Sequence, residues 1–324
     1  MRADPATNPI MVRHRGADDL VLPFHLPASG VRGRLVRLGH AAQEILSRHD
    51  YAQPVAHLLA ELLVLAGGLG SLMKFDGVFS LQTKGDGPVK LMVADVTSKG
   101  ALRAYAEADR ARVLALGAEG GAPSLRALLG QGYLALTVDP QGQQRYQGIV
   151  ALEGERLADC FLHYFRQSEQ LDTAIHLAAE PLAGSWRAAG LILQRLPEVE
   201  HSGVGHGADE AERERRRDAW QRARLLLGTL TDRELLDASV MPERLLWRLF
   251  HEEGVAAETA RPLAAACRCS RRRIEGVLAA LSDAELAEMT VDGMIHVTCQ
   301  FCNRRYDFDQ AGLAELLGRL RVSH

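Results

Sequence analysis

Four cysteines near the carboxyl end constrain the fold of this chain more than any other feature. They form two short motifs, Cys267-Arg268-Cys269 and Cys299-Gln300-Phe301-Cys302. Zinc in closed structural sites favours four thiolates at the corners of a tetrahedron, and C-x-x-C is a common way for one turn to present two of them. C-x-C is less common, but it also brings two sulfurs close to one ion. We therefore predict that Cys267, Cys269, Cys299 and Cys302 together bind one zinc ion.

The residues around the cysteines predict a compact α/β module that returns the chain to the metal. Ser270 is placed to cap a helix, and Ser282-Asp283-Ala284-Glu285 forms a capping box for a second one. Met294 to Cys299 alternates like a strand, and the alternation continues through Tyr306 and Phe308. A final helix is predicted over Gln310 to Leu320. We assign this zinc-binding domain to residues 259–324.

The start of the chain bears on how the cysteines are interpreted. Met1 to Asp19 has no apolar core of the kind a secretory signal needs, so we expect a cytoplasmic protein. In a reducing compartment, clustered cysteines are interpreted first as a metal site and second as disulfides. The fifth cysteine, Cys160, is far away in sequence, and we predict that it is a buried helix residue with a minority chance of being reactive.

A zinc ion at these cysteines has two interpretations that the sequence leaves open. It could serve only to fold the module, since structural zinc supplies on the order of 10–16 kcal/mol in small finger peptides. It could also act as a switch, because oxidation that removes the thiolates would release the metal and the fold it supports. Nearby arginines either favour the thiolates or form a solvated basic face; they are Arg268, Arg271, Arg272, Arg273, Arg304 and Arg305. His296 is interpreted as a surface strand residue, because four cysteines already complete a tetrahedron.

From about residue 31 to residue 200 the pattern predicts an α+β core domain, preceded by an extension over residues 1–30. Helices are expected over Val31 to Ser47, over the apolar stretch Pro54 to Met73 and over Arg156 to Leu171. Strand pairs are expected on either side of two turns, Gly85-Asp86-Gly87-Pro88 and Asp139-Pro140-Gln141-Gly142. Two more extended segments are expected at Thr173 to Ala179 and Ala188 to Leu196.

Residues 201–258 have a different composition and are assigned to a charged, helical linker. Asp209 to Arg224 contains five acidic and six basic residues, so it is expected to be a solvated helix or a mobile segment. Thr231-Asp232-Arg233-Glu234 is a capping box, and Pro242 suits the first position of a following helix. That helix carries Leu245, Leu246, Leu249 and Phe250. Because these helices are short, we expect their order to depend on docking against a neighbouring domain.

Three stretches together resemble the heat shock protein 33 family, the redox-regulated chaperonins, over most of the chain. The first is Val31-Arg32-Gly33-Arg34-Leu35-Val36-Arg37-Leu38. The second runs from Lys74-Phe75-Asp76-Gly77 through Gly85-Asp86-Gly87-Pro88-Val89-Lys90-Leu91 to Ala104-Tyr105. The third is Cys267-x-Cys269-Ser270-Arg271 with Cys299-Gln300-Phe301-Cys302-Asn303. The charged segment around Gly203 to Arg224 is longer than the family pattern needs.

The resemblance implies a function as well as a fold. It implies an α+β core, a helical linker and a C-terminal zinc domain, with the reduced, zinc-bound protein inactive as a chaperone. By analogy, oxidation would join Cys267 to Cys269 and Cys299 to Cys302, release zinc and unfold the linker. The oxidised protein would dimerise and bind unfolding client proteins. We name no client-binding residues, because apolar helix residues usually serve to pack the core.

Other functional classes compete with this expectation. A thiol-disulfide oxidoreductase could use Cys299 and Cys302 without stoichiometric zinc, although the second cysteine pair argues against it. A zinc-ribbon nucleic-acid binder needs a basic surface, whereas the formal charge of the whole chain is -3. A membrane span over Pro54 to Met73 is rejected because Glu61 lies within it. No set of catalytic residues is identifiable, so we expect a protein that is not an enzyme. From the charge and from Glu61, we also expect that it binds neither nucleic acid nor membrane.

Overall fold

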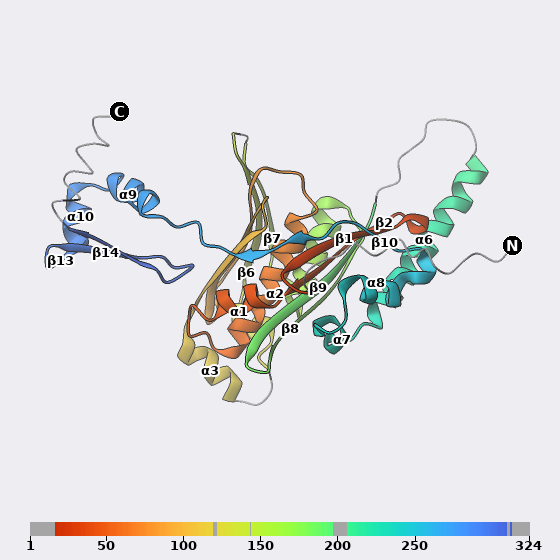
Figure 1. Cartoon of the computed structure of the whole chain (residues 1–324), viewed down its shortest axis with the longest axis horizontal. Helices are drawn as coiled ribbons and strands as arrows, with labels where there is room; N and C mark the ends of the chain where they lie inside the picture. The colour runs from red at the N-terminus through yellow and green to blue at the C-terminus, as the bar shows by residue number, and fades with distance from the viewer. Residues whose placement is uncertain (1–16, 119–121, 143, 197–205, 310–311, 313–324) are drawn as a thin grey trace. The chain divides into compact units, whose positions relative to one another are not determined.

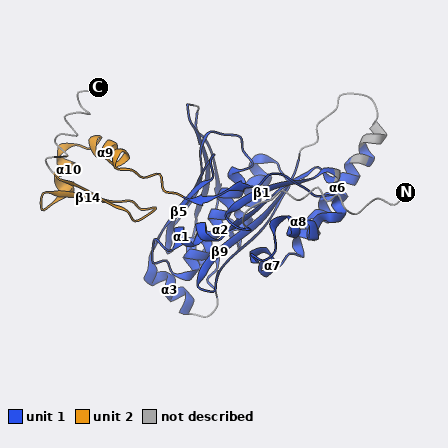
Figure 2. Cartoon of the chain, in the orientation of Figure 1, with its two compact units in different colours: residues 1–265 blue, residues 266–324 orange. Residues whose placement is uncertain are grey.

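The computed structural model describes residues 17–118, 122–142, 144–196, 206–309 and 312. The chain divides into two compact units, residues 1–265 and residues 266–324 (Figure 2). The mixed α and β architecture agrees with the predicted α+β fold class. The final helix predicted over Gln310 to Leu320 lies outside the described residues, apart from Gly312.

Two antiparallel sheets enclose one apolar helix in the larger unit (Figure 1). The helix is α2, Gln53–Gly70, and its buried residues include Leu59, Leu62 and Leu63. Its length and composition would allow it to cross a membrane, but 78% of it is buried inside the fold. Val36 and Ile192 of the first sheet and Phe79 and Met92 of the second belong to the same core cluster. The helix predicted at Pro54 to Met73 is therefore confirmed as the centre of a protein core.

In both sheets, many strands that are neighbours in the chain are also neighbours in the sheet. The first sheet has the order β10-β1-β2-β9-β8, with β11 also pairing with β1. Its strands are β1 Leu20–Leu26, β2 Val31–Leu38, β8 Thr173–Leu182, β9 Ser185–Arg195, β10 Ala256–Ala257 and β11 Arg261–Pro262. The second sheet has the order β12-β5-β4-β3-β6-β7. Its strands are β3 Gly77–Gly85, β4 Val89–Thr97, β5 Ala101–Ala108, β6 Gly132–Pro140, β7 Tyr146–Ala151 and β12 Ala264–Ala265.

The predicted strand pairs are confirmed, and three short helices complete this part of the fold. The turn at residues 85–88 connects β3 to β4, and the turn at residues 139–142 lies between β6 and β7. The helices are α3 Arg110–Ala118, α4 Leu125–Leu129 and α5 Leu157–Tyr164. A π-helical turn follows α5 at Phe165–Glu169, so the helix expected to reach Leu171 ends earlier. Cys160 lies on α5 and is fully buried, as predicted.

The helix predicted over Val31 to Ser47 is wrong in its first half. Residues 31–38 form strand β2, and only His40–Leu46 is helical, as α1. Strand β2 is buried on both faces, so its apolar residues do not alternate with polar ones in the usual way. Gly33 lies against the ring of Phe24, where an added Cβ would come within 2.1 Å of the ring. Arg34 and Arg37 of this strand are both buried.

The linker helices cover the outer face of the first sheet (Figure 1). They are α6 His206–Gly228, α7 Asp232–Leu236 and α8 Pro242–Phe250. The buried residues of α6 include Trp220, Ala223 and Leu227, so this helix is docked along its second half. Phe250 of α8 stacks on Phe24 of β1, with ring centroids 5.9 Å apart. The helix starts predicted at Thr231 and Pro242 are confirmed.

Three very short strands follow the linker and attach the chain to both sheets. β10 and β11 pair with β1, and β12 pairs in parallel with β5. Residues 259–265, which the sequence-based division placed in the zinc domain, therefore belong to the larger unit. Strand β1 likewise lies within the range predicted as an N-terminal extension. The very short strands β10 and β11 pair with β1, and β12 pairs with β5; each of these pairings joins segments far apart in the chain, which local sequence does not reveal.

Within residues 266–309, the smaller unit contains two helices and one sheet. Its elements are α9 Arg271–Ala279, α10 Asp283–Met289, β13 Thr290–Val291, β14 Met294–Thr298 and β15 Arg305–Asp309. Ser270 and Ser282 cap the two helices, as predicted. The buried core of the described residues consists of Leu278, Leu286, Ile295 and Phe308. The core formed by the described residues is small, so we expect this part of the unit to need further support.

The packing of α8 leads to a prediction about linker docking. Replacing Phe250 with Ala removes a fully buried ring, and such changes destabilise by about 3–5 kcal/mol. We expect faster hydrogen exchange at the amides of α7 and α8, with little change in α2. Trp247→Ala is the matched control, because Trp247 is on the same helix and is 40% exposed. Equal exchange rates in the two variants would contradict the assigned packing.

Candidate metal centre

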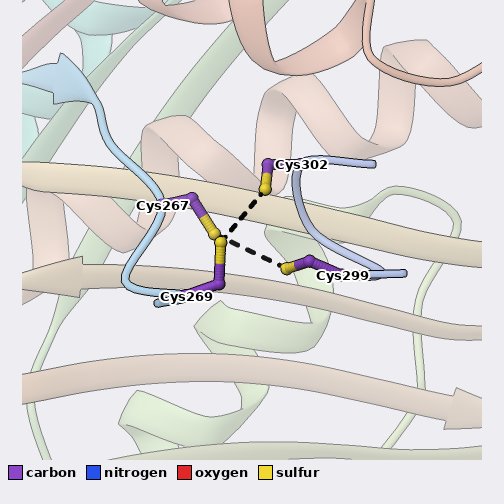
Figure 3. A group of neighbouring side chains, drawn as sticks. All are labelled: Cys267, Cys269, Cys299 and Cys302. Atoms are coloured by element: carbon purple, nitrogen blue, oxygen red, sulfur yellow. Dashed lines mark hydrogen bonds between the residues drawn. The ribbon is translucent and has the colours of Figure 1, made fainter. Parts of the chain in front are cut away.

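The four predicted cysteines converge in the smaller unit from two loops (Figure 3). Cys267 and Cys269 lie between β12 and the start of α9, and Cys299 and Cys302 lie in the turn between β14 and β15. In this turn the Cys299 amide donates to the Arg304 carbonyl at 2.9 Å, and the Asn303 amide donates to the Cys299 carbonyl at 2.8 Å. These bonds fold the backbone tightly and point both sulfurs of the C-x-x-C motif to one side.

The first turn of α9 holds the C-x-C loop beside that turn. The Arg271 guanidinium lies 4.4 Å from the centre of the Phe308 ring and donates to the Asp307 carbonyl at 3.1 Å. Arg273 donates to the Arg268 carbonyl at 3.0 Å. These two arginines therefore connect the loop, the helix and β15. They had been predicted only to lie near the cysteines.

The sulfur geometry fits a tetrahedral metal site. All four sulfurs lie within 4.8 Å of one another, with Cys267 3.7 Å from Cys299 and Cys269 3.3 Å from Cys302. Zinc bound to four sulfurs at about 2.3 Å separates neighbouring sulfurs by about 3.8 Å. A disulfide would need about 2.0 Å, and all four thiols are free. The arrangement therefore fits zinc bound by Cys267, Cys269, Cys299 and Cys302.

The thiols have different proton affinities because they share hydrogen bonds. Burial raises the pKa of Cys299, and burial with hydrogen bonds to the other thiols raises the pKa of Cys302 to about 12. At Cys267 burial also acts to raise the pKa, but hydrogen bonds from Cys269, Cys302 and Cys299 outweigh it and lower the pKa to about 7. Without metal, the cluster thus favours a thiolate at Cys267 over thiolates at Cys299 and Cys302. Metal binding must remove the remaining protons.

Two polar side chains lie near the sulfurs: Tyr306, which was not predicted as a site residue, and Arg304, which was predicted to lie near the cysteines. The Tyr306 hydroxyl donates to the Cys269 sulfur at 3.2 Å. A hydrogen bond to Tyr306 is the main cause that raises the pKa of Arg304, and Arg304 also lies close to Cys269 and Cys302. Tyr306 was interpreted only as a strand residue, because its position on β15 reveals its face but not what the hydroxyl touches.

Two other candidates lie outside the cluster. His296 is an exposed residue of β14, as predicted, and its Nδ1 lies 2.6 Å from the Asp307 carboxylate. Cys160 lies in the other unit, where burial raises the pKa of its thiol to about 11. A neutral buried thiol is a poor nucleophile.

The geometry predicts proton release on metal binding. Near pH 7 the thiols of Cys299 and Cys302 are protonated, so zinc binding should release their protons and the apparent affinity should rise with pH. Isothermal titration calorimetry of reduced protein in buffers with different ionisation enthalpies measures the released protons. One zinc ion per chain is expected, and Cys302→Ser should reduce both affinity and proton release. An affinity for zinc that does not change between pH 6 and pH 8 would contradict a four-thiolate site.

Comparison with known proteins places these features in a wider context. A family model described as "Hsp33 protein" matches residues 19–309. The 33 kDa chaperonin of Caulobacter vibrioides strain NA1000 is 42% identical over 302 residues, which cover 91% of this chain and 96% of that protein. The 33 kDa chaperonin of Pseudomonas fluorescens strain Pf-5 is 41% identical over 303 residues, which cover 92% and 93%.

A solved structure agrees with the fold. The crystal structure of the 33 kDa chaperonin, a heat shock protein 33 homologue, from Thermotoga maritima superposes with a TM-score of 0.78. The match covers 94% of this chain and all of that one, at 23% sequence identity. The earlier resemblance is thus confirmed along nearly the whole chain. From its family match and its relatives at about 40% identity, this chain belongs to the Hsp33 family of chaperones.

Proposed function

We propose that this protein is a holdase chaperone whose activity is controlled by oxidation of the four-cysteine site. In the reduced form, zinc held by Cys267, Cys269, Cys299 and Cys302 keeps the protein inactive. Oxidation forms disulfides, releases zinc and unfolds the linker, and the exposed surface then binds unfolding or aggregation-prone proteins. The observation that carries the proposal is the convergence of four free thiols at metal-binding distance, in a unit whose described residues form a small core.

The route from metal to linker is short along the chain. Cys267 follows β12 after one residue, and β10, β11 and β12 each contain two residues. Such short strands contribute little pairing energy, so they depend on the segments on both sides. When the C-x-C loop loses its metal, one of these anchors is lost. The strands can then detach from β1 and β5, and α8 loses its connection on its carboxyl side.

Release of the linker would expose a large apolar surface on the first sheet and another on the linker helices. The sheet contributes residues of β1, β2 and β9, among them Leu22, Phe24, Leu35, Leu191 and Leu193, all fully buried now. The linker contributes Leu245, Leu246 and Phe250. Exposed apolar patches of this kind bind other proteins. We propose unfolded client proteins as partners and, when oxidised, a second copy of this chain.

The proposed chemistry involves two disulfides, Cys267–Cys269 and Cys299–Cys302. For each one, two thiols lose two electrons and two protons to an oxidant such as hydrogen peroxide, which becomes two molecules of water. The shortest sulfur contacts instead cross between the motifs, from Cys267 to Cys299 and from Cys269 to Cys302. Both pairings are sterically close, so the pairing needs a direct test.

Peptide mapping distinguishes the two pairings. Trypsin cleaves after Arg268, Arg271 and Arg273, so Cys267, Cys269 and the Cys299–Cys302 pair end up in three separate peptides. We expect oxidised protein to yield one linked pair of peptides containing Cys267 and Cys269. The peptide with Cys299 and Cys302 should be alone, with an internal disulfide. Three peptides linked together would instead establish the crossed pairing and overturn this part of the proposal.

The central test compares reduced and oxidised protein directly. Peroxide should release one zinc ion per chain, and the oxidised sample should suppress aggregation of a heat-denatured model protein without nucleotide. Reduced, zinc-loaded protein should not, and a variant with all four cysteines changed to Ser should be unresponsive to peroxide. Cys160→Ser is the control and should respond like wild type. Equal suppression by the reduced and oxidised samples would contradict redox control.

The same samples separate the alternative functions. A thiol-disulfide oxidoreductase would turn over a small disulfide substrate through Cys299 and Cys302 without needing stoichiometric zinc. A nucleic-acid binder would show steep salt dependence in filter binding. Neither activity is expected here.

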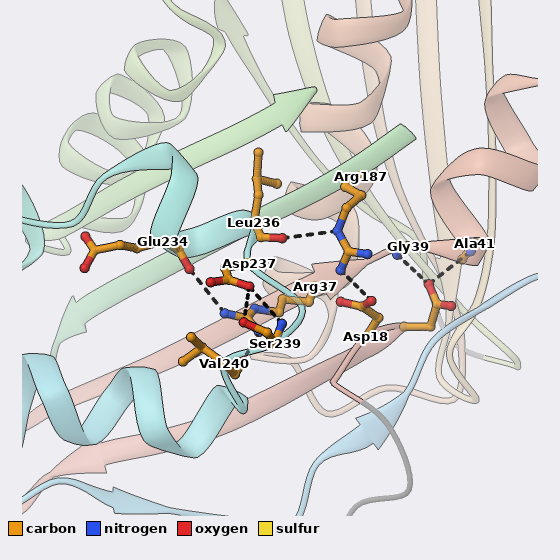
Figure 4. Close-up of polar contacts among 11 residues, drawn as sticks. Asp18, Arg37, Gly39, Ala41, Arg187, Glu234, Leu236, Asp237, Ser239 and Val240 are labelled. Atoms are coloured by element: carbon orange, nitrogen blue, oxygen red, sulfur yellow. Dashed lines mark hydrogen bonds and ion pairs between the residues drawn. The ribbon is translucent and has the colours of Figure 1, made fainter. Parts of the chain in front are cut away.

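A polar latch holds the linker in addition to apolar packing (Figure 4). We define it as Arg37 and Arg187, which donate to backbone carbonyls at the end of α7 and in the following loop. Arg37 donates to the carbonyls of Val240 and Glu234, and Arg187 donates to that of Leu236 at 3.1 Å. Arg187 also pairs with Asp18. Cations suit this end of a helix because its last carbonyls carry partial negative charge.

Removing one arginine of the latch should make the linker helices easier to release from the sheet. Arg37→Met leaves the Val240 carbonyl without its donor, and a lost buried hydrogen bond costs about 1–3 kcal/mol. We expect the opening equilibrium of α7 and α8 to rise about 5- to 150-fold in reduced protein, measured by hydrogen exchange. Arg32→Met is the control, because Arg32 is on the same strand but donates to Gln194 of β9. Protection in Arg37→Met equal to that in the control would show that the latch has no such role.

A further inference from the structure

We infer that Tyr306, supported by Arg304, is a positioning residue that slows loss of metal from the sulfur site. The inference depends on the proposed metal centre but not on the proposed chaperone cycle. Its basis is a chain of contacts in which Arg304 bonds to the Tyr306 hydroxyl and that hydroxyl donates to the Cys269 sulfur at 3.2 Å. Neither side chain is itself a metal ligand in this arrangement.

The fold fixes the Tyr306 hydroxyl in this position. Tyr306 lies on β15, where it pairs with Val297 of β14, and its ring packs against the small core of the unit. Arg304 precedes β15, and its carbonyl closes the turn by accepting from the Cys299 amide. The same few residues therefore shape the C-x-x-C turn and place a hydroxyl against a sulfur of the other motif. This hydroxyl is a polar link between the two motifs that does not require a metal.

The direction of the effect follows from the charge on a metal-bound thiolate. A hydrogen bond donated to the thiolate withdraws electron density from sulfur and makes it harder to protonate or oxidise. The positive guanidinium of Arg304 strengthens this bond by polarising the hydroxyl, since charge-assisted hydrogen bonds are the stronger class. Hydrogen-bond partners of metal ligands typically alter metal affinity by about 10- to 100-fold when removed. Tyr306 is expected to act within that range.

Tyr306→Phe isolates the hydroxyl, because the ring and its packing remain. Cobalt, which gives thiolate-to-metal absorption bands, serves as the probe of the metal site in the full-length reduced protein. We expect Tyr306→Phe to bind cobalt and zinc about 10- to 100-fold more weakly and to release zinc faster to a chromophoric chelator. The charge-transfer band should shift to lower energy, because the electrons of Cys269 are no longer stabilised by the hydrogen bond. Arg304→Met should change the metal affinity, the rate of zinc release and the band energy in the same directions as Tyr306→Phe, but by smaller amounts.

Thr290→Val is the matched control within the same unit. The Thr290 hydroxyl donates to the Leu286 carbonyl at 2.7 Å and does not contact sulfur among the described residues. This variant tests for a general loosening of the smaller unit, which could alter the metal affinity but would leave the energy of the charge-transfer band unchanged. A band at the same energy in wild type and Tyr306→Phe, with equal affinities, would overturn the inference while leaving the metal centre intact. Failure of wild-type protein to bind either metal would overturn the metal centre itself, and this inference with it.

Discussion

The structure of the smaller unit depends on four sulfurs being brought to one point. In the part of this unit that the structure describes, four buried apolar residues and two capped helices are not expected to offset alone the entropy of ordering the segment. The loops that present the sulfurs contain tight turns and few apolar contacts, so they gain stability mainly from whatever the sulfurs bind. Zinc contributes on the order of 10–16 kcal/mol in comparable small units. Metal binding and folding are therefore expected to be one event here.

The larger unit, in contrast, is rich in apolar surface, and its two sheets and α2 do not cover all of it. α2 fills the space between the two sheets, and the outer face of the first sheet remains to be buried. Short linker helices cover this face, helped by Phe250 on Phe24 and by the arginine latch. Buried cations are costly to desolvate, and burial lowers the pKa of Arg37 accordingly. The linker is thus held by a mixture of favourable packing and expensive polar contacts.

Local sequence predicted those parts of the molecule that depend on local chemistry. Short sequence motifs with a well-defined local structure underlie the correct predictions. These are the helix caps at Thr231, Ser270 and Ser282, the turn at residues 85–88 and the cysteine site. The errors occurred where distant pairing decides the outcome. The pattern over residues 31–38 predicts a helix, whereas pairing with the distant β9 makes this segment strand β2. The prediction also places β1 and residues 259–265 outside the core. Tyr306 was missed because a hydroxyl beside a sulfur leaves no pattern in sequence.

The magnitudes explain how a small metal site could control the linker. Moving an equilibrium from one part in a hundred to ninety-nine parts in a hundred needs about 5.5 kcal/mol. Metal binding in the smaller unit involves about two to three times that amount, so only part of it has to reach the linker through the segment from β10 to Cys267. The linker must then be close to balance without zinc, since a linker with a large docking energy of its own would stay closed after oxidation. The two-residue strands β10, β11 and β12 contribute little pairing energy, so under the proposed control the apolar packing and the arginine latch together must supply less docking energy than the metal site can offset.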